Sequence, residues 1–89
     1  MKERYLEVTF RHGQPIAAYY YLPRETNQKS VRTRRVEPGL VIDFSADGQA
    51  IGIEITAPAK VSLAGLNAVL RELGHSPATE ADLAPVLAA

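Results

Sequence analysis

Apolar and polar residues alternate through the first two thirds of the chain, which is the pattern of β-strands. Leu6, Val8 and Phe10 fall on one side of the first such segment and polar residues fall mostly on the other. Glycine and proline in the stretch 11–15 mark a turn before the alternation resumes. The strands that this pattern predicts cover residues 5–10, 16–22, 31–36, 40–44 and 50–55.

The second strand, 16–22, has no polar face, so its pattern does not say which face meets the core. One face carries isoleucine, alanine, tyrosine and leucine, and the other carries alanine and two tyrosines. The polar stretch 23–30 that follows is rich in turn-forming residues, and we expect a loop there.

The last third of the chain changes from a strand period to a helical period. Ser62 can cap a helix that runs to about Leu73, and Gly74 suits the end of that helix. A second short helix begins at Thr79, where Asp82 supplies a capping-box partner. The apolar stripe of the first helix consists of Leu63, Leu66, Leu70 and Leu73.

Together these elements predict a single α+β domain over residues 1–89. Residues 1–57 are expected to form an antiparallel β-meander of four to five strands, and 58–89 a helical C-terminal segment. We expect one C-terminal helix to pack on one face of the sheet. The short terminal helix is expected at an end of the sheet or against a partner.

The stretch DFSADGQAIGIE, residues 43–54, has the spacing of a calcium-binding loop. A calcium loop of that kind joins two helices, whereas both flanks here alternate as strands. Asp47-Gly48 is also a dipeptide well suited to a two-residue type I′ hairpin turn. We therefore interpret the stretch as a β-hairpin rather than a metal site.

A two-residue turn sets the register of this hairpin. Asp43 and Glu54 then share its polar face as diagonal neighbours, and we expect two solvated acids there. A weak contact with a cation or an arginine is the alternative, so a weak metal-binding protein stays among the hypotheses. The apolar pairs that this register predicts are Phe44 with Ile51, Ile42 with Ile53, and Leu40 with Ile55.

Composition narrows the function further. The chain has 89 residues, so its core is thin and burial against a second copy would help it. Ten basic and ten acidic residues give a formal net charge of zero, so no overall electrostatic field attracts the protein to nucleic acid or to a membrane surface. The sequence has neither the apolar run of a signal peptide nor one long enough to span a bilayer. A cytoplasmic protein with no membrane association is expected.

Candidate catalytic and metal-binding chemistry is sparse. Cysteine is absent, and the two histidines, His12 and His75, lie far apart beside glycines at predicted turns. No G-x-S-x-G elbow and no phosphate-binding glycine loop occurs. We expect no enzymatic activity, no cofactor and no metal.

Basic residues and tyrosines are the remaining candidates for binding. If 31–36 is an edge strand, arginines on it block edge-to-edge aggregation. The same arginines could instead contact nucleic acid or an acidic partner, with tyrosines stacking on bases. Tyrosines are also frequent in protein interfaces. The candidate partner-binding residues are Tyr19, Tyr20, Tyr21, Arg32, Arg34 and Arg35.

The segments VEPGLVIDF at 36–44, Asp47-Gly48, and IGIEI at 51–55 resemble a small, mostly bacterial family known as domain of unknown function number 2283. Its members read E-x-x-P-G-V-x-x-D and then D-G-x-x-x-G-I-E-I. The resemblance covers about residues 11–58, although Arg11-His12-Gly13-Gln14 replaces the usual acidic turn. It implies a β-meander without an established activity. Some members lie beside small toxin-like genes, which implies a two-gene regulatory pair.

The preferred hypothesis is a small non-enzymatic interaction module. It is expected to be a homodimer, to bind a second protein, or both, as the partner or antitoxin-like half of a bacterial regulatory pair. The first alternative is a nucleic-acid-binding protein that uses the basic 29–35 strand together with the tyrosines of 19–21. The second alternative is the weak metal-binding protein.

Overall fold

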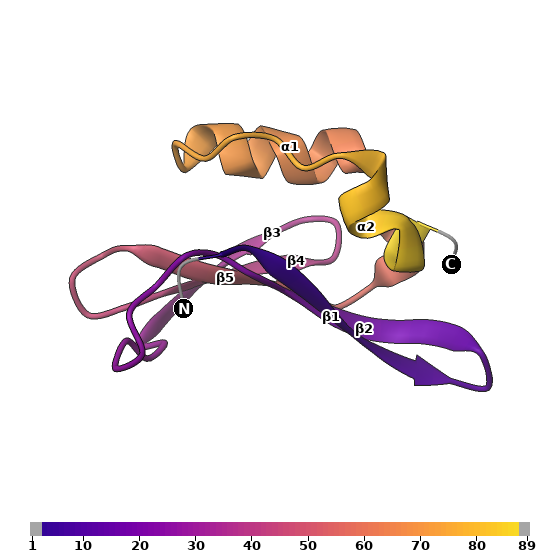
Figure 1. The fold of residues 1–89 in the computed structure, drawn as a ribbon, viewed down its shortest axis with the longest axis horizontal. Coiled ribbons are helices and arrows are strands. Elements are labelled where there is room, and N and C mark those ends of the chain that lie inside the picture. Colours follow the sequence, from indigo (N-terminus) through magenta and orange to yellow (C-terminus); the bar gives the residue numbers. More distant parts are fainter. Residues whose placement is uncertain (1–2, 88–89) are drawn as a thin grey trace.

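One antiparallel sheet with two helices on one face makes up the part of the chain that the computed structural model describes, residues 3–87 (Figure 1). The predicted α+β class is confirmed. The ends of the predicted domain, 1–2 and 88–89, lie outside the described residues. The elements are β1 (Tyr5–Arg11), β2 (Gln14–Tyr21), β3 (Arg32–Val36), β4 (Leu40–Phe44), β5 (Ala50–Ile55), the short 3-10 helix η1 (Pro58–Lys60), α1 (Leu63–Glu72) and α2 (Glu80–Leu87).

The strands lie in the order β1-β2-β5-β4-β3, with every neighbouring pair antiparallel. Consecutive strands pair as in a meander except that β2 pairs with β5 instead of β3. The linker between β2 and β3 therefore crosses to the far edge of the sheet, where the Val31 amide donates to the Phe44 carbonyl over 2.9 Å. As a result β1 and β3 are the two edges, so the condition under which arginines of the 31–36 strand protect an edge is met.

The hairpin of β4 and β5 confirms most of the predicted register. Leu40 lies opposite Ile55 and Ile42 lies opposite Ile53. The predicted partner of Phe44 is wrong, because Phe44 pairs with Ala50 and the register shifts between residues 43 and 44.

A longer turn than expected causes that shift. The Gly48 amide donates to the Ser45 carbonyl over 3.0 Å, and the Ser45 amide donates to the Gln49 carbonyl over 2.9 Å. The loop therefore holds three residues, 46–48, and Gly48 has the positive φ, 86°, that such loops need at their last position. Asp47 favours this loop because its carboxylate accepts hydrogen bonds from the Ser45 hydroxyl and the Gln49 amide.

The core lies between the sheet and the two helices. It resolves the ambiguity of β2: Ala18, Tyr20 and Leu22 face the helices, so Tyr19 and Tyr21 face the opposite side. The remaining core consists of Leu40, Ile42, Phe44, Ala50, Ile53, Ile55, Leu66, Val69, Leu70, Ala78, Leu83 and Val86.

Both helices begin at the predicted caps. The Ser62 hydroxyl accepts from the Gly65 amide over 3.0 Å at the start of α1. The side-chain amide of Asn67 donates to and accepts from the backbone of Ala78, which fixes the connection between α1 and α2. The terminal helix α2 packs on the same face as α1, over β1 and β2. None of the helices in residues 3–87 has the length and apolarity needed to cross a membrane.

Acid should destabilise α2 through its cap. The Thr79 amide donates to the Asp82 carboxylate over 2.9 Å and the Asp82 amide donates to the Thr79 hydroxyl over 3.2 Å. Backbone and side-chain hydrogen bonds with Thr79 lower the pKa of Asp82 below 3.8. Because the pKa is lower in the folded state, this stabilisation is fully present above the ordinary pKa of aspartate. It is lost as the pH falls below that value and through the lower pKa of the folded state.

Thermal unfolding between about pH 7 and pH 3 tests this cap, since that range spans the ordinary pKa of aspartate. We expect Asp82→Asn to lower the melting temperature at neutral pH and to reduce its fall in acid. Glu80→Gln, in the same helical turn, is the matched control. An acid-dependent fall as steep in Asp82→Asn as in the wild type would contradict the role of this carboxylate.

Candidate functional site

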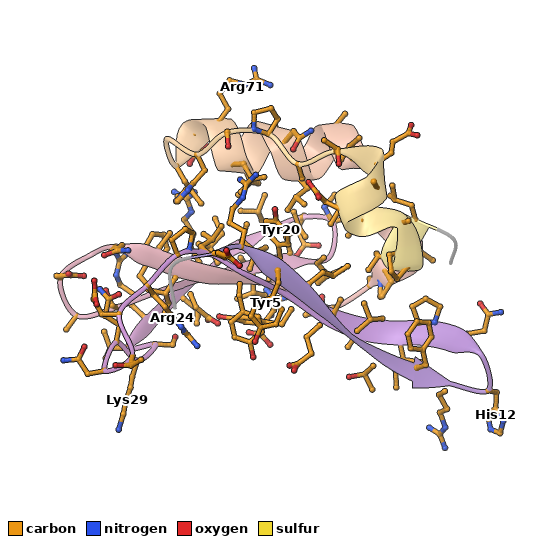
Figure 2. All side chains as sticks on the ribbon, viewed as in Figure 1. Tyr5, His12, Tyr20, Arg24, Lys29 and Arg71 are labelled. Carbon is orange, nitrogen blue, oxygen red and sulfur yellow. The ribbon has the colours of Figure 1, made fainter. Side chains whose placement is uncertain are left out.

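The face of the sheet away from the helices carries a row of three tyrosines, Tyr5, Tyr19 and Tyr21, which we term the tyrosine row. Figure 2 shows Tyr5 and Arg24 on this open side and Tyr20 on the helix side. Alternation along β1 and β2 places the three rings together, because Tyr5 is the direct cross-strand partner of Tyr21.

The rings of the tyrosine row are in contact with one another. Tyr5 and Tyr21 stack with centroids 4.5 Å apart and an interplanar angle of 18°. Tyr19 meets Tyr21 edge to face at 4.6 Å. The Arg24 guanidinium lies 5.3 Å from the Tyr21 centroid, and the Tyr21 hydroxyl donates to Glu7 over 3.2 Å.

Tyr19 crosses the sheet from β2 to β4. Its direct partner on β5 is Glu54, but its ring leans over Gly52 and its hydroxyl donates to the Asp43 carboxylate over 2.7 Å. Gly52 makes this possible, because a Cβ there would lie 2.0 Å from the Tyr19 hydroxyl oxygen. Asp43 lies directly opposite Gly52 and is buried, 7% exposed. Because Gly52 has no side chain, the Tyr19 ring can lie over it and reach Asp43.

Burial, followed by the neighbouring Asp43 carboxylate, raises the pKa of Tyr19 well above its ordinary value of 10.0. Burial and Glu7 raise the pKa of Tyr21 as well. Both phenols are thus protonated donors at neutral pH. The arrangement is an aromatic surface held by hydrogen bonds and ring contacts.

Asp43 corrects one expectation from the sequence. It is diagonal to Glu54 as predicted, since Glu54 lies opposite Val41, but it is not a solvated acid. The ligand positions of the apparent calcium loop also have separate contacts: Asp43 accepts from Tyr19, whereas Ser45 and Asp47 bond to each other. No group of three or more histidines or acids in residues 3–87 is placed so that it could hold a metal ion.

The arginines of β3 lie at the opposite edge of the sheet from β1. Arg34 forms an ion pair with Glu72 of α1 at 2.5 Å, and Arg32 lies over the Phe44 ring at 4.5 Å, so both side chains point to the helix side. Arg35 alternates to the other side and lies 3.8 Å from Glu37.

The six candidate partner-binding residues are therefore not brought together. Tyr19 and Tyr21 share the tyrosine row, whereas Tyr20 is 2% exposed and belongs to the core. Three strand spacings, about 14 Å, separate β2 from the arginines of β3.

Sequence reasoning missed Tyr5 and Gly52. Tyr5 could not be grouped with the other rings while the buried face of β2 was undecided. Gly52 did carry a signal, because an isolated glycine inside a strand often marks a close approach by another group.

The comparison with known families supports the resemblance seen in the sequence. The family described as "Protein of unknown function (DUF2283)" matches residues 17–57. The matched segment contains Tyr19, Asp43 and Gly52, and it ends before the helices. The chain matches no curated protein and no solved structure.

Proposed function

We propose that this protein is a non-enzymatic interaction module and that the open face of its sheet binds a second protein through the tyrosine row. The observation that supports this most strongly is the position of the row. On the sheet face that neither helix covers, the Tyr21 ring contacts the rings of both Tyr5 and Tyr19, and Tyr5 is 44% exposed.

The rings are ordered before any partner arrives. Tyr19 is fixed by Asp43, Tyr21 packs between Tyr5 and Tyr19, and Arg24 lies beside Tyr21. Large aromatic side chains that are already held in one conformation lose little further entropy on binding. Tyrosine and arginine are also the residues that most often dominate the energy of protein interfaces.

A protein partner fits this face better than a nucleic acid. Glu7, Asp43 and Glu54 all lie among or beside the tyrosines, where they would repel phosphates. The three arginines of β3 are at the other edge, and Arg34 is already paired with Glu72. The one arginine described beside the row, Arg24, lies against the Tyr21 ring. In the regulatory-pair form of the proposal, the partner is the product of the neighbouring gene and this chain is the antitoxin-like half.

Affinity capture with the immobilised protein tests the tyrosine row. The variant is Tyr21→Thr, which removes the central ring and keeps a residue suited to a strand. Arg71→Ala is the matched control, because Arg71 is exposed and points away from the sheet (Figure 2). The wild type and the control should retain the same protein, and Tyr21→Thr should bind that protein at least about tenfold more weakly.

Retention of the same proteins by Tyr21→Thr and by the wild type would overturn the proposed site. Circular dichroism of the variant, compared with the wild type, shows that any loss of binding occurs in a folded chain.

A further inference from the structure

The outer edge of β1 is a second surface, distinct from the open face. In the strand order no strand of residues 3–87 lies beyond β1, so the outward backbone groups of its seven residues have no strand partner. Phe10 is 53% exposed and Tyr5 is 44% exposed on the same strand. A long edge without proline and with exposed aromatic residues is suited to pairing with another strand.

The other edge of the sheet is built differently. Four of the five residues of β3 are exposed, and three of them are arginines. A second β3 could pair with this strand antiparallel about a two-fold axis, with the same face of both sheets on the same side. An axis at any of the three arginines then places that arginine opposite its own copy, and an axis at Thr33 places Arg32 opposite Arg34 twice. The edge at β3 is therefore protected against pairing, whereas the edge at β1 is not.

We propose that two copies of this chain pair through β1, antiparallel, with Val8 on the two-fold axis. The sequence of β1 is self-complementary in this register. Its pairs are Val8 with Val8, Leu6 with Phe10, Glu7 with Thr9, and Tyr5 with Arg11 of the second copy. The apolar pairs fall on the helix side of the joined sheet, and the pairs with polar or charged members fall on the open side.

Other registers of the β1 pairing place less compatible residues opposite each other. A shift by one residue would place apolar residues opposite polar ones throughout the strand. Centring the axis on Glu7 would place two glutamates opposite each other. Centring it on Thr9 would pair only residues 7–11 and leave the partly buried Leu6 and the exposed Tyr5 without strand partners. The axis at Val8 uses all seven residues and covers Phe10 with Leu6 twice.

This inference goes beyond the proposed function because it does not require a partner on the tyrosine row. It joins two five-stranded sheets into one continuous sheet. The two tyrosine rows then lie on the same side, one on each side of the axis, with Arg11 of one copy beside Tyr5 of the other. A single partner could therefore meet two copies of the row, which raises its apparent affinity.

Charge substitution at Thr9 tests the register. Thr9 is exposed, and in the proposed pairing it faces Glu7 of the second copy twice by symmetry. Thr9→Glu opposes like charges and should raise the dimer dissociation constant about tenfold. Thr9→Lys opposes unlike charges at the same position and should leave the dimer as tight as the wild type or tighter. Sedimentation velocity over a concentration series measures both, with circular dichroism to establish folding.

A double variant gives the rescue. Glu7→Lys combined with Thr9→Glu places a lysine opposite a glutamate across the pairing and should restore the dimer. A wild type that is monomeric at high micromolar concentration would overturn the proposal. So would equal weakening by Thr9→Glu and Thr9→Lys, because that result fits an axis at Thr9. A dimer that is lost in Tyr21→Thr and kept in Thr9→Glu would place self-association on the tyrosine row instead.

Discussion

Gly52→Ala is expected to destabilise the protein by about 3 kcal/mol, although the substitution adds only a methyl group. In an ordinary strand interior, alanine is more stable than glycine by about 0.5–1 kcal/mol. Here the new Cβ would lie 2.0 Å from the Tyr19 hydroxyl oxygen and 2.3 Å from two ring carbons. Tyr19 would have to leave its position, and the buried Asp43 carboxylate would then lose its donor.

A double-mutant cycle with Tyr19→Ala measures this effect by urea unfolding. In the Tyr19→Ala background the ring is absent, so Gly52→Ala should cost almost nothing or should stabilise. Glu54→Ala, on the same face of β5 and exposed, is the control for substitution in this strand. A similar cost of Gly52→Ala in both backgrounds would show that Tyr19 is not the group that requires glycine.

The elements that the sequence predicts well depend on local signals. Ser62, Gly74 and the pair of Thr79 and Asp82 fix the helix ends through contacts within a few residues. The β4–β5 hairpin has alternating residues on both sides of a turn, so its existence and most of its register follow from pattern alone. Only the end of the hairpin differs, because the side chain of Asp47 selects a three-residue loop.

The candidate site could not be predicted in the same way because it depends on contacts between distant segments. The second strand is apolar on both faces, and only the pairing of β2 with β5 places Tyr19 beside Gly52. By sequence pattern Asp43 belongs to the polar, solvent-exposed face of its strand. In the structure it is buried and bonded to Tyr19 of β2. Both Asp43 and Gly52 lie inside the segment 17–57 that the family model matches. Together they hold Tyr19 across the sheet, because Gly52 leaves room for its ring and Asp43 accepts the hydrogen bond of its hydroxyl.

Removal of the Tyr19 hydroxyl should therefore be costly. Tyr19→Phe keeps the ring in place but leaves the buried Asp43 carboxylate without the donor that lies 2.7 Å away. A charged group left unpaired in a buried position costs about 2 kcal/mol or more. We expect a loss of that size in the free energy of unfolding, measured by urea denaturation at neutral pH.

Tyr21→Phe is the matched control, because it removes the same atom from the next ring of the row. The Tyr21 hydroxyl bonds over 3.2 Å to Glu7, which is exposed and can turn to water instead, so the cost should stay below about 0.5 kcal/mol. The second change Asp43→Leu should recover part of the loss in Tyr19→Phe, since it replaces the unpaired acid with an apolar group. Equal costs for the two phenylalanine variants would mean that Asp43 reaches water and that the tyrosine row is not anchored through it. The rigidity on which the proposed binding depends would then have to come from ring stacking alone.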